Sequence, residues 1–303
     1  MLQNKFRILF FLFFLCCSSA FAQDKEPMME LNSASLTERW LLDQDKVKSF
    51  KIMPHKPVYM LLYNYTGDIN NQPKSENPIN TVNEPTEYQN AELTFQLSFK
   101  SRIGRLNKNK KFQVDFWLAY TQLSKWQVYN GALSRPFRET NYEPELIVVF
   151  PVNYKIFGLD GVYFGVALTH QSNGQSDPYS RSWNRVIFHA GWENENWSIV
   201  FNPWIRWDEE AMTDNNPEIE NYMGRAQLLT AFSKGKTNLS LAARHSLRGG
   251  NNNRGSLRLQ ANYQIAGNLY GLLQVFHGYG ENMIDYNHKQ TTVGIGVSLV
   301  RWR

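Results

Sequence analysis

His170, Ser172 and Asn184 are residue types that could supply a nucleophile, its base and a group that orients the base. A hydroxyl becomes an effective nucleophile when an imidazole accepts its proton, and the imidazole needs a third group that fixes its tautomer. An Asn carbonyl oxygen can accept from one ring N–H and leave the other ring nitrogen free for the Ser proton. The set indicates acyl-transfer chemistry, while a cluster of mutually hydrogen-bonded polar groups at a membrane interface is the alternative.

The hydrophobic pattern around these residues places them on the outer, apolar face of a sheet. Along residues 161–172 apolar and polar positions alternate, and His170 and Ser172 continue the apolar parity. Asn184 has the apolar parity of the next such segment. The apolar residues of this face are Val162, Phe164, Val166, Leu168, Val186, Phe188 and Ala190. Polar groups exposed to lipid cost free energy unless they bond to one another, so we expect a functional site here.

The elements that carry these residues recur along the chain. Period-two alternation begins near residue 56 and defines about twelve segments of about ten residues. The expected strands are 56–66, 90–101, 112–123, 144–153, 161–172, 184–190, 197–206, 220–232, 237–246, 254–265, 269–277 and 291–302. Because lipid tolerates no open sheet edge, an even number of such strands predicts an all-β protein, a 12-stranded antiparallel transmembrane β-barrel of the outer membrane.

The connections between these strands alternate in length, which gives the barrel an orientation. Long connections such as 173–183 are followed by short ones such as 191–196, and outer-membrane barrels have their long loops outside the cell. The three polar residues would therefore lie toward the outer leaflet. A soluble β-sandwich or lipocalin-like barrel is the competing fold. The charged residues of the polar face suit a hydrated lumen better than a dry interior: Lys100, Asp115, Arg225, Arg244 and Arg258.

The N-terminus predicts export. Lys5 and Arg7 precede an apolar stretch that ends near Ala22, so residues 1–22 are expected to be a cleaved signal peptide that contains both cysteines. Residues 23–55 would form an N-terminal periplasmic segment with a short helix, opened by the capping box at 35–38, and residues 56–303 the barrel. Removing the signal peptide lowers the formal charge from +5 to +3, too little to suggest a nucleic-acid partner.

Three stretches of the chain resemble the outer membrane phospholipase A family: His170–Asn184, Pro136–Pro144 and Gly278–Asn287. The resemblance extends from about residue 57 to residue 300. It implies a 12-stranded barrel that hydrolyses acyl esters of glycerophospholipids, with phospholipase A1/A2 and lysophospholipase activity. It also implies dependence on calcium and activity as a homodimer in the outer membrane, with membrane phospholipids as substrate.

The resemblance also implies roles for the three polar residues and for a neighbouring glycine. By position, Ser172 is similar to the family's nucleophile, His170 to its general base and acid, and Asn184 to the residue that holds the imidazole. The backbone N–H of Gly174 matches the family's oxyanion donor. The same three residues singled out by strand parity are thus those that the family uses for ester hydrolysis.

The calcium ligands implied by the resemblance are oxygen atoms. They are the backbone carbonyl of Gln175, the hydroxyl of Ser180 and the backbone carbonyl of Ser134 of the partner subunit. The family often has Arg where this chain has Gln175, but a backbone ligand survives that change. Asp177 could add a carboxylate, or could simply form a turn with Pro178. Oxygen ligands of this kind suit Ca²⁺.

Gln122 is a further polar residue with outward parity, and it corresponds to an interface glutamine of the family. Two symmetry-related amides could bond across a homodimer, whereas a single one could lie near the lipid headgroups. Two other functions stay open. They are a non-enzymatic barrel, such as a channel or a structural protein, and a soluble secreted esterase. A pore has no use for His170, Ser172 and Asn184 on its outer wall, so the enzyme is favoured.

Overall fold

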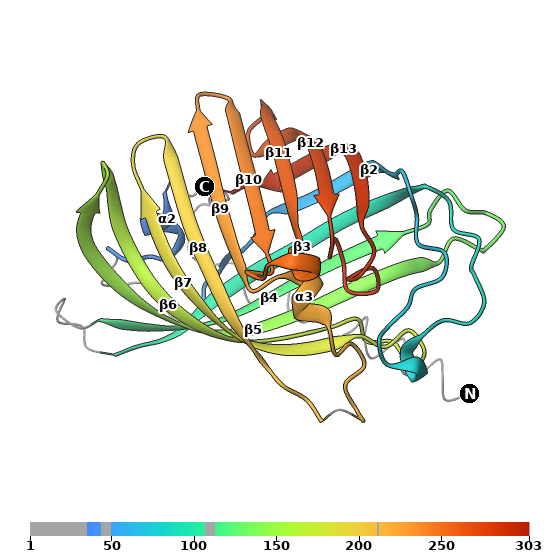
Figure 1. Ribbon diagram of the computed structural model, residues 1–303. Coiled ribbons are helices and arrows are strands. Elements are labelled where there is room, and N and C mark those ends of the chain that lie inside the picture. Colours follow the sequence, from blue (N-terminus) through green and yellow to red (C-terminus); the bar gives the residue numbers. More distant parts are fainter. Residues whose placement is uncertain (1–34, 44–49, 107–112, 211, 303) are drawn as a thin grey trace, which may run out of the picture. The chain divides into compact units, whose positions relative to one another are not determined.

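Twelve antiparallel strands close into a barrel within the described residues, which are 35–43, 50–106, 113–210 and 212–302 of a computed structural model (Figure 1). The strands are β2 (Val58–Thr66), β3 (Ala91–Leu106), β4 (Val114–Trp126), β5 (Phe137–Ile156), β6 (Leu159–Ser172), β7 (Ser182–Glu193), β8 (Trp197–Trp207), β9 (Ala226–Lys234), β10 (Thr237–His245), β11 (Gly255–Ala266), β12 (Leu269–Gly278) and β13 (Gln290–Val300). The expected signal peptide lies outside the described residues.

Each barrel strand pairs with its neighbours in sequence, and β13 pairs with β2, so that the sheet is closed. A short strand, β1 (Ile52–Pro54), adds to β3. The other elements are α2 (Leu36–Arg39), α3 (Ile219–Met223) and the 3₁₀ turns η1 (Pro78–Asn80) and η2 (Gly250–Asn252). None of the described helices is long and apolar enough to cross a membrane. The sequence-based prediction of a 12-stranded antiparallel barrel is therefore confirmed.

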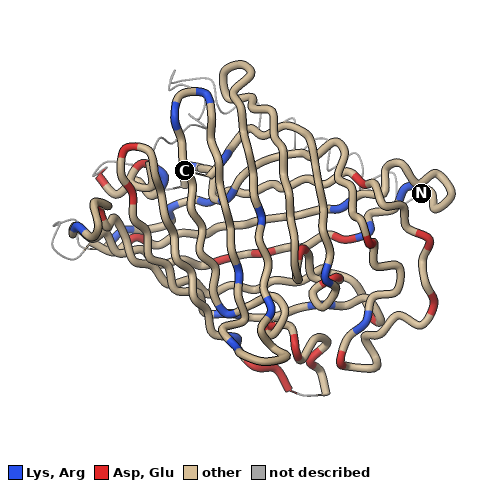
Figure 2. Tube along the Cα trace, turned by 45° about the horizontal axis from the view of Figure 1, so that its top comes forward, with Lys and Arg blue, Asp and Glu red and all other residues tan. Residues whose placement is uncertain are grey.

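The two faces of the wall are inverted relative to a soluble protein. On β3, Leu97 and Phe99 are 48% and 45% exposed, whereas Ser98 and Lys100 are buried. Charged residues are interspersed along the barrel (Figure 2). Lys100 and Asp115 are fully buried, as expected for residues of the lumen face. An apolar exterior around a polar interior excludes the soluble sandwich and the lipocalin-like barrel, because both would bury their apolar face.

Three details of the strand prediction were wrong. Val162 was expected on the outer face, but the register shifts between Gly161 and Tyr163, and Val162 joins the buried apolar cluster. Such a bulge reverses the parity of the residues on one side of it. β5 begins at Phe137 instead of residue 144. β9 begins at Ala226, because the first residues of the expected strand 220–232 form α3.

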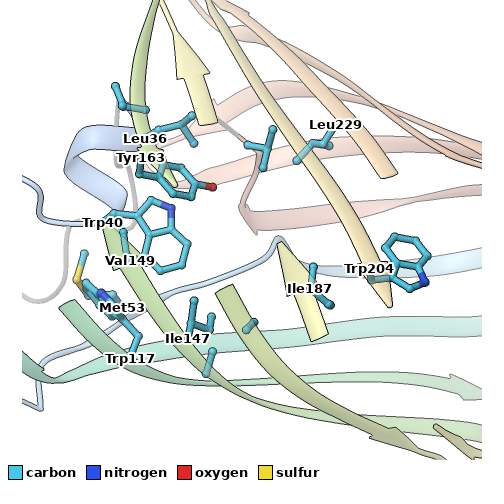
Figure 3. Packing of buried hydrophobic residues seen from close by; sticks show 14 of the residues in the cluster. Leu36, Trp40, Met53, Trp117, Ile147, Val149, Tyr163, Ile187, Trp204 and Leu229 are labelled. Carbon is cyan, nitrogen blue, oxygen red and sulfur yellow. The ribbon is translucent and has the colours of Figure 1, made fainter. Parts of the chain in front are cut away.

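The expected short helix forms and reaches into the barrel interior. The Ser35 hydroxyl accepts from the Glu38 N–H at 3.1 Å, and this cap starts α2. Trp40, just after α2, packs edge-on against Trp117 with ring centroids 5.5 Å apart (Figure 3). The Lys100 ammonium lies 3.0 Å from the centroid of the Trp40 ring. The segment is therefore plug-like, and it covers a buried cation with an aromatic face.

At the loop side of the barrel, ion pairs tie the connection 279–289 to the wall. Arg138 binds Glu92 of β3 through Nε at 3.0 Å and Asp285 of the connection through Nη1 at 2.7 Å. Lys125 adds a bond to Glu281 at 2.8 Å. Burial alone would raise the pKa of Asp285. The positive charge of the Arg138 guanidinium outweighs the effect of burial and holds the pKa of Asp285 below its ordinary value. The loop that covers the lumen is thus anchored electrostatically.

We expect Trp40→Ala to lower the free energy of unfolding by about 3–5 kcal/mol, because it leaves a cavity and removes the ring face over Lys100. Chemical denaturation in detergent micelles, followed by circular dichroism, measures this change. Trp207→Ala removes an indole that is 67% exposed and serves as the matched control. Equal losses in the two variants would contradict a plug role for Trp40.

Candidate active site

His170 and Asn184 face each other across the β6–β7 pair. They are direct register partners, and His170 Nδ1 lies 2.8 Å from Asn184 Oδ1. A carbonyl oxygen only accepts, so the ring must carry its proton on Nδ1 for this bond to form. The other ring nitrogen, Nε2, then has a lone pair and can act as a base. Both side chains belong to the outer face of the wall, as strand parity predicts.

Ser172 follows His170 by two residues and ends β6 on the same face. A two-residue step along a strand spans about 6–7 Å, which brings the hydroxyl into the neighbourhood of the imidazole. In the described part of the chain, the Ser172 hydroxyl makes no hydrogen bond to the His170 ring, and Nε2 of that ring has no protein partner. The structure thus shows the expected hydrogen bond between His170 and Asn184, and among the described residues none between Ser172 and His170. Catalytic hydrogen bonds are often incomplete in the absence of substrate.

Gly174 occupies a backbone position that other residues tolerate poorly. Its φ is +64°, and a Cβ there would lie 2.9 Å from the Tyr142 ring. Within the described residues its N–H has no hydrogen-bond partner. An unengaged N–H close after Ser172 is what an oxyanion donor requires, because it must be free to bind the charge that develops on the substrate oxygen.

The loop 173–181 is organised by the buried side chain of Asn173. Its Nδ2 donates to the Tyr179 carbonyl at 2.8 Å, and its Oδ1 accepts from the Arg181 N–H at 3.0 Å and the Gln175 N–H at 3.4 Å. Glu139 of β5 accepts a second bond from the same amide group at 3.2 Å. The backbone at Gln175 and the stretch before Arg181 are therefore fixed from one centre.

The expected metal ligands in this loop are oxygen atoms, and the structure gives hydrogen-bond partners for two of the residues concerned. Ser180 Oγ accepts from Asn215 at 3.0 Å, which leaves it a further lone pair. Asp177 is oriented by Asn80, whose amide donates to the carboxylate at 2.7 Å. Among the described residues no three His, Cys, Asp or Glu side chains form a metal-binding group. A donor set of carbonyls, a hydroxyl and one nearby carboxylate fits Ca²⁺ chemically.

Ser134 and Gln122 do not join the triad in this chain. Ser134 is exposed in the connection 127–136 with φ at +59°, an uncommon backbone conformation for Ser. Gln122 accepts from the Tyr120 hydroxyl at 3.2 Å and donates to Ser124 Oγ at 3.1 Å. The amide of Gln122 is thus already hydrogen-bonded within its own strand. No hydrogen bond links either residue to the triad in the described ranges.

Glu209 contacts Asn184, and the sequence pattern did not predict this contact. Asn184 Nδ2 donates to Glu209 Oε1 at 3.1 Å, from the connection after β8. Burial raises the pKa of the Glu209 carboxyl above its ordinary value, and Asp214 adds to the shift, while Arg206 opposes it. Trp207 is the register partner of Asn184. A carboxylate two residues beyond the partner strand's end was the available signal, but it needed the register to be known.

Comparisons with known proteins identify the family of this chain. Residues 36–299 match the family model described as Phospholipase A1. A putative phospholipase A1 of Neisseria meningitidis is 38% identical over 81% of this chain, a match that spans 64% of that protein. Phospholipase A1 of Escherichia coli is 36% identical over 84% of each chain.

Two solved structures are also similar. Outer membrane phospholipase A from Escherichia coli superposes with a TM-score of 0.76 at 34% identity, covering 88% of this chain and 98% of that one. A Salmonella typhi outer membrane phospholipase dimer with bound calcium gives the same TM-score and identity, covering 88% and 99%. The family match extends over nearly all of the barrel that carries His170, Ser172 and Asn184. The chain therefore belongs to the phospholipase A1 family and is an outer-membrane phospholipase.

Proposed function

We propose that this phospholipase hydrolyses acyl esters of glycerophospholipids with a Ser172–His170–Asn184 triad on the barrel exterior. The observation that carries the proposal is the 2.8 Å bond between His170 and Asn184 on the hairpin β6–β7, whose neighbouring exposed residues Phe164, Leu168 and Phe188 are apolar. Exposing a polar pair to lipid costs free energy, so its presence on this face indicates a function. Phospholipids reach this face directly from the membrane, which suits phospholipase A1/A2 and lysophospholipase activity.

The chain's own groups can perform both halves of an ester hydrolysis. His170 Nε2 takes the proton of Ser172 as the hydroxyl oxygen attacks the ester carbonyl, and then gives it to the leaving lysophospholipid oxygen. Water next attacks the acyl-Ser172 ester by the same route and releases the fatty acid. Asn184 keeps the Nδ1 proton in place throughout. The Gly174 N–H is placed to donate to the oxygen that becomes negative.

Calcium is the proposed cofactor, held by the Gln175 carbonyl, the Ser180 hydroxyl and the carbonyl of Ser134 of the partner subunit. When bound, the ion supplies Lewis-acid stabilisation of the negative charge that develops on the ester oxygen. Asn173 and Asn215 support this assignment because they fix the backbone and the hydroxyl that would serve as ligands. The similar outer membrane phospholipase dimer of Salmonella typhi has bound calcium, which also supports the assignment.

A homodimer is the proposed active form. Gln122, Tyr142 and Ser172 are register partners in one row across β4, β5 and β6. Neighbouring strands lie about 4.8 Å apart, so the expected interface amide is only about 10 Å from the nucleophile along the sheet. A ligand donated by the partner subunit would couple calcium binding to association, because each would favour the other.

The same proposal extends to processing and location. Residues 1–22 would be removed as a signal peptide, and 23–55 would form a periplasmic segment before the barrel at 56–303. Long connections such as 173–181 lie at the triad's end of the barrel, and short ones such as 194–196 lie at the other end. By the usual arrangement of outer-membrane barrels, the active site would face the outer leaflet.

We expect Ser172→Ala to lower phospholipid hydrolysis at least about 1000-fold, because the attacking oxygen is removed. Release of fatty acid from mixed micelles measures the rate, and circular dichroism verifies the fold. Ser101→Ala is the matched control, since its hydroxyl lies on β3 without a hydrogen-bond partner in the structure. Normal turnover by Ser172→Ala would overturn the assignment of the nucleophile.

Chelation with excess EGTA should suppress activity, and added Ca²⁺ should restore it where Mg²⁺ does not, because Mg²⁺ tolerates irregular oxygen sites poorly. Ser180→Ala should raise the Ca²⁺ concentration for half-maximal activity about tenfold or more, as one ligand is lost. A calcium titration of wild type and variant gives both values. Full activity in EGTA would remove calcium from the mechanism.

Gln122→Ala should weaken the dimer and lower activity several-fold. The expected size of the effect corresponds to the loss of one pair of hydrogen bonds between the two subunits. Chemical cross-linking in detergent, combined with specific activity at increasing dilution, measures both effects. Thr291→Ala removes an exposed polar side chain of β13 and is the control. If Gln122→Ala cross-links and turns over like wild type, Gln122 has no part in association.

A further inference from the structure

The Asn184 amide is engaged on both sides, and its two partners have different requirements. Its oxygen faces His170 Nδ1 at 2.8 Å, and its nitrogen donates to Glu209 Oε1 at 3.1 Å. Three neighbouring strand ends therefore carry the groups concerned. They are Ser172 and His170 at the end of β6, Asn184 at the start of β7 and Glu209 just after β8. Asn184 and Glu209 are both partly buried, whereas His170 is exposed.

An Asn amide can rotate by 180° and exchange its oxygen and nitrogen. In the flipped state, the amide N–H groups would point at His170, and the ring would have to accept through Nδ1 and carry its proton on Nε2. That tautomer cannot take the Ser172 proton. The flipped oxygen would also face the Glu209 carboxylate, two acceptors with no proton between them. An ionised Glu209 thus selects the productive orientation of the amide.

We propose that Glu209 is a positioning residue that acts through Asn184 and holds His170 in its catalytic tautomer. The inference rests on the proposed function and deepens it. It also gives a physical reason for an amide at the position that orients the imidazole. A carboxylate at residue 184 would lie against Glu209, and two carboxylates in contact repel unless one of them binds a proton.

The surroundings of Glu209 keep its loop in place. Arg206 of β8 binds Asp214 at 2.7 Å, which pins the connection that begins with residue 208. The charged groups that act on Glu209 are Asp214 on the same connection, Arg206 on β8 and His170 on β6. Asn184 is its contact on β7. The carboxylate therefore lies within the electrostatic influence of Asp214, Arg206 and His170, and it contacts the amide that it orients.

The test is an exchange of charge between residues 184 and 209. We expect Glu209→Gln and Glu209→Ala to lower kcat about tenfold with little change in KM, as a lost charged hydrogen bond predicts. Asn184→Asp alone should lose more. Adding Glu209→Gln to Asn184→Asp should restore kcat about tenfold, because the Gln amide can donate to the new carboxylate. Glu210→Gln, at an exposed neighbouring position, is the matched control.

A second measurement does not depend on turnover. Nitrogen-15 chemical shifts of the His170 ring report which nitrogen carries the proton, and we expect Glu209→Ala to lower the fraction protonated on Nδ1. Circular dichroism verifies that each variant is folded. Glu209→Gln should thus lower kcat when residue 184 is Asn and raise kcat when residue 184 is Asp. A residue with only a general structural role would not produce this reversal.

The outcomes separate this inference from the proposed function. If hydrolysis requires Ser172 but the variants at residue 209 match wild type in kcat and ring protonation, the positioning role is overturned and the triad stands. If wild-type hydrolysis does not require Ser172, the triad fails, and the ring protonation alone decides whether Glu209 orients Asn184. Equal losses from Glu209→Gln in both backgrounds would also overturn the inference.

Discussion

Hydrocarbon offers no hydrogen-bond partner, and this constraint determines both the fold and the place of the chemistry. Every backbone N–H and C=O inside the membrane must be satisfied within the protein, so the twelve strands close on one another with β13 against β2. The same constraint applies to side chains on the outer wall. Polar groups there must bond to each other, as His170 does to Asn184 and Asn184 does to Glu209. The candidate site is thus a local polar patch on an apolar wall, and its own hydrogen bonds reduce the cost of exposing it to lipid.

The lumen contains charged side chains, and charges in a narrow interior must be paired or covered. Arg138 and Lys125 share the Glu92 carboxylate, and each also binds a residue of the connection 279–289. At the other end, Trp40 covers the Lys100 ammonium. A buried pair is weak evidence for stability, but breaking one leaves an uncompensated charge. These contacts tie the connection 279–289 and the segment around Trp40 to the barrel wall, which also includes the hairpin β6–β7 with the proposed triad.

The loops add the parts that a strand cannot provide. A strand offers side chains at fixed intervals but engages its N–H groups in the ladder, so an unengaged N–H must come from a turn such as that at Gly174. Carbonyl ligands likewise require backbone that has left the sheet. Asn173 holds this turn and the proposed metal-binding stretch together. The strands supply side chains at fixed intervals, and the loop supplies backbone groups that are not engaged in the sheet. This explains why the candidate site lies where the two strands end.

The sequence by itself determined the class of fold and singled out the three residues of the proposed triad. Period-two alternation is a local property of extended backbone, so it placed His170, Ser172 and Asn184 on one face and gave the number of strands. It could not reveal the register shift that buries Val162, or the helix at 219–223, because both depend on packing against distant strands. Only the tertiary structure brought Glu209 to Asn184 and Asn215 to Ser180, since those contacts depend on how separate connections fold over the barrel rim.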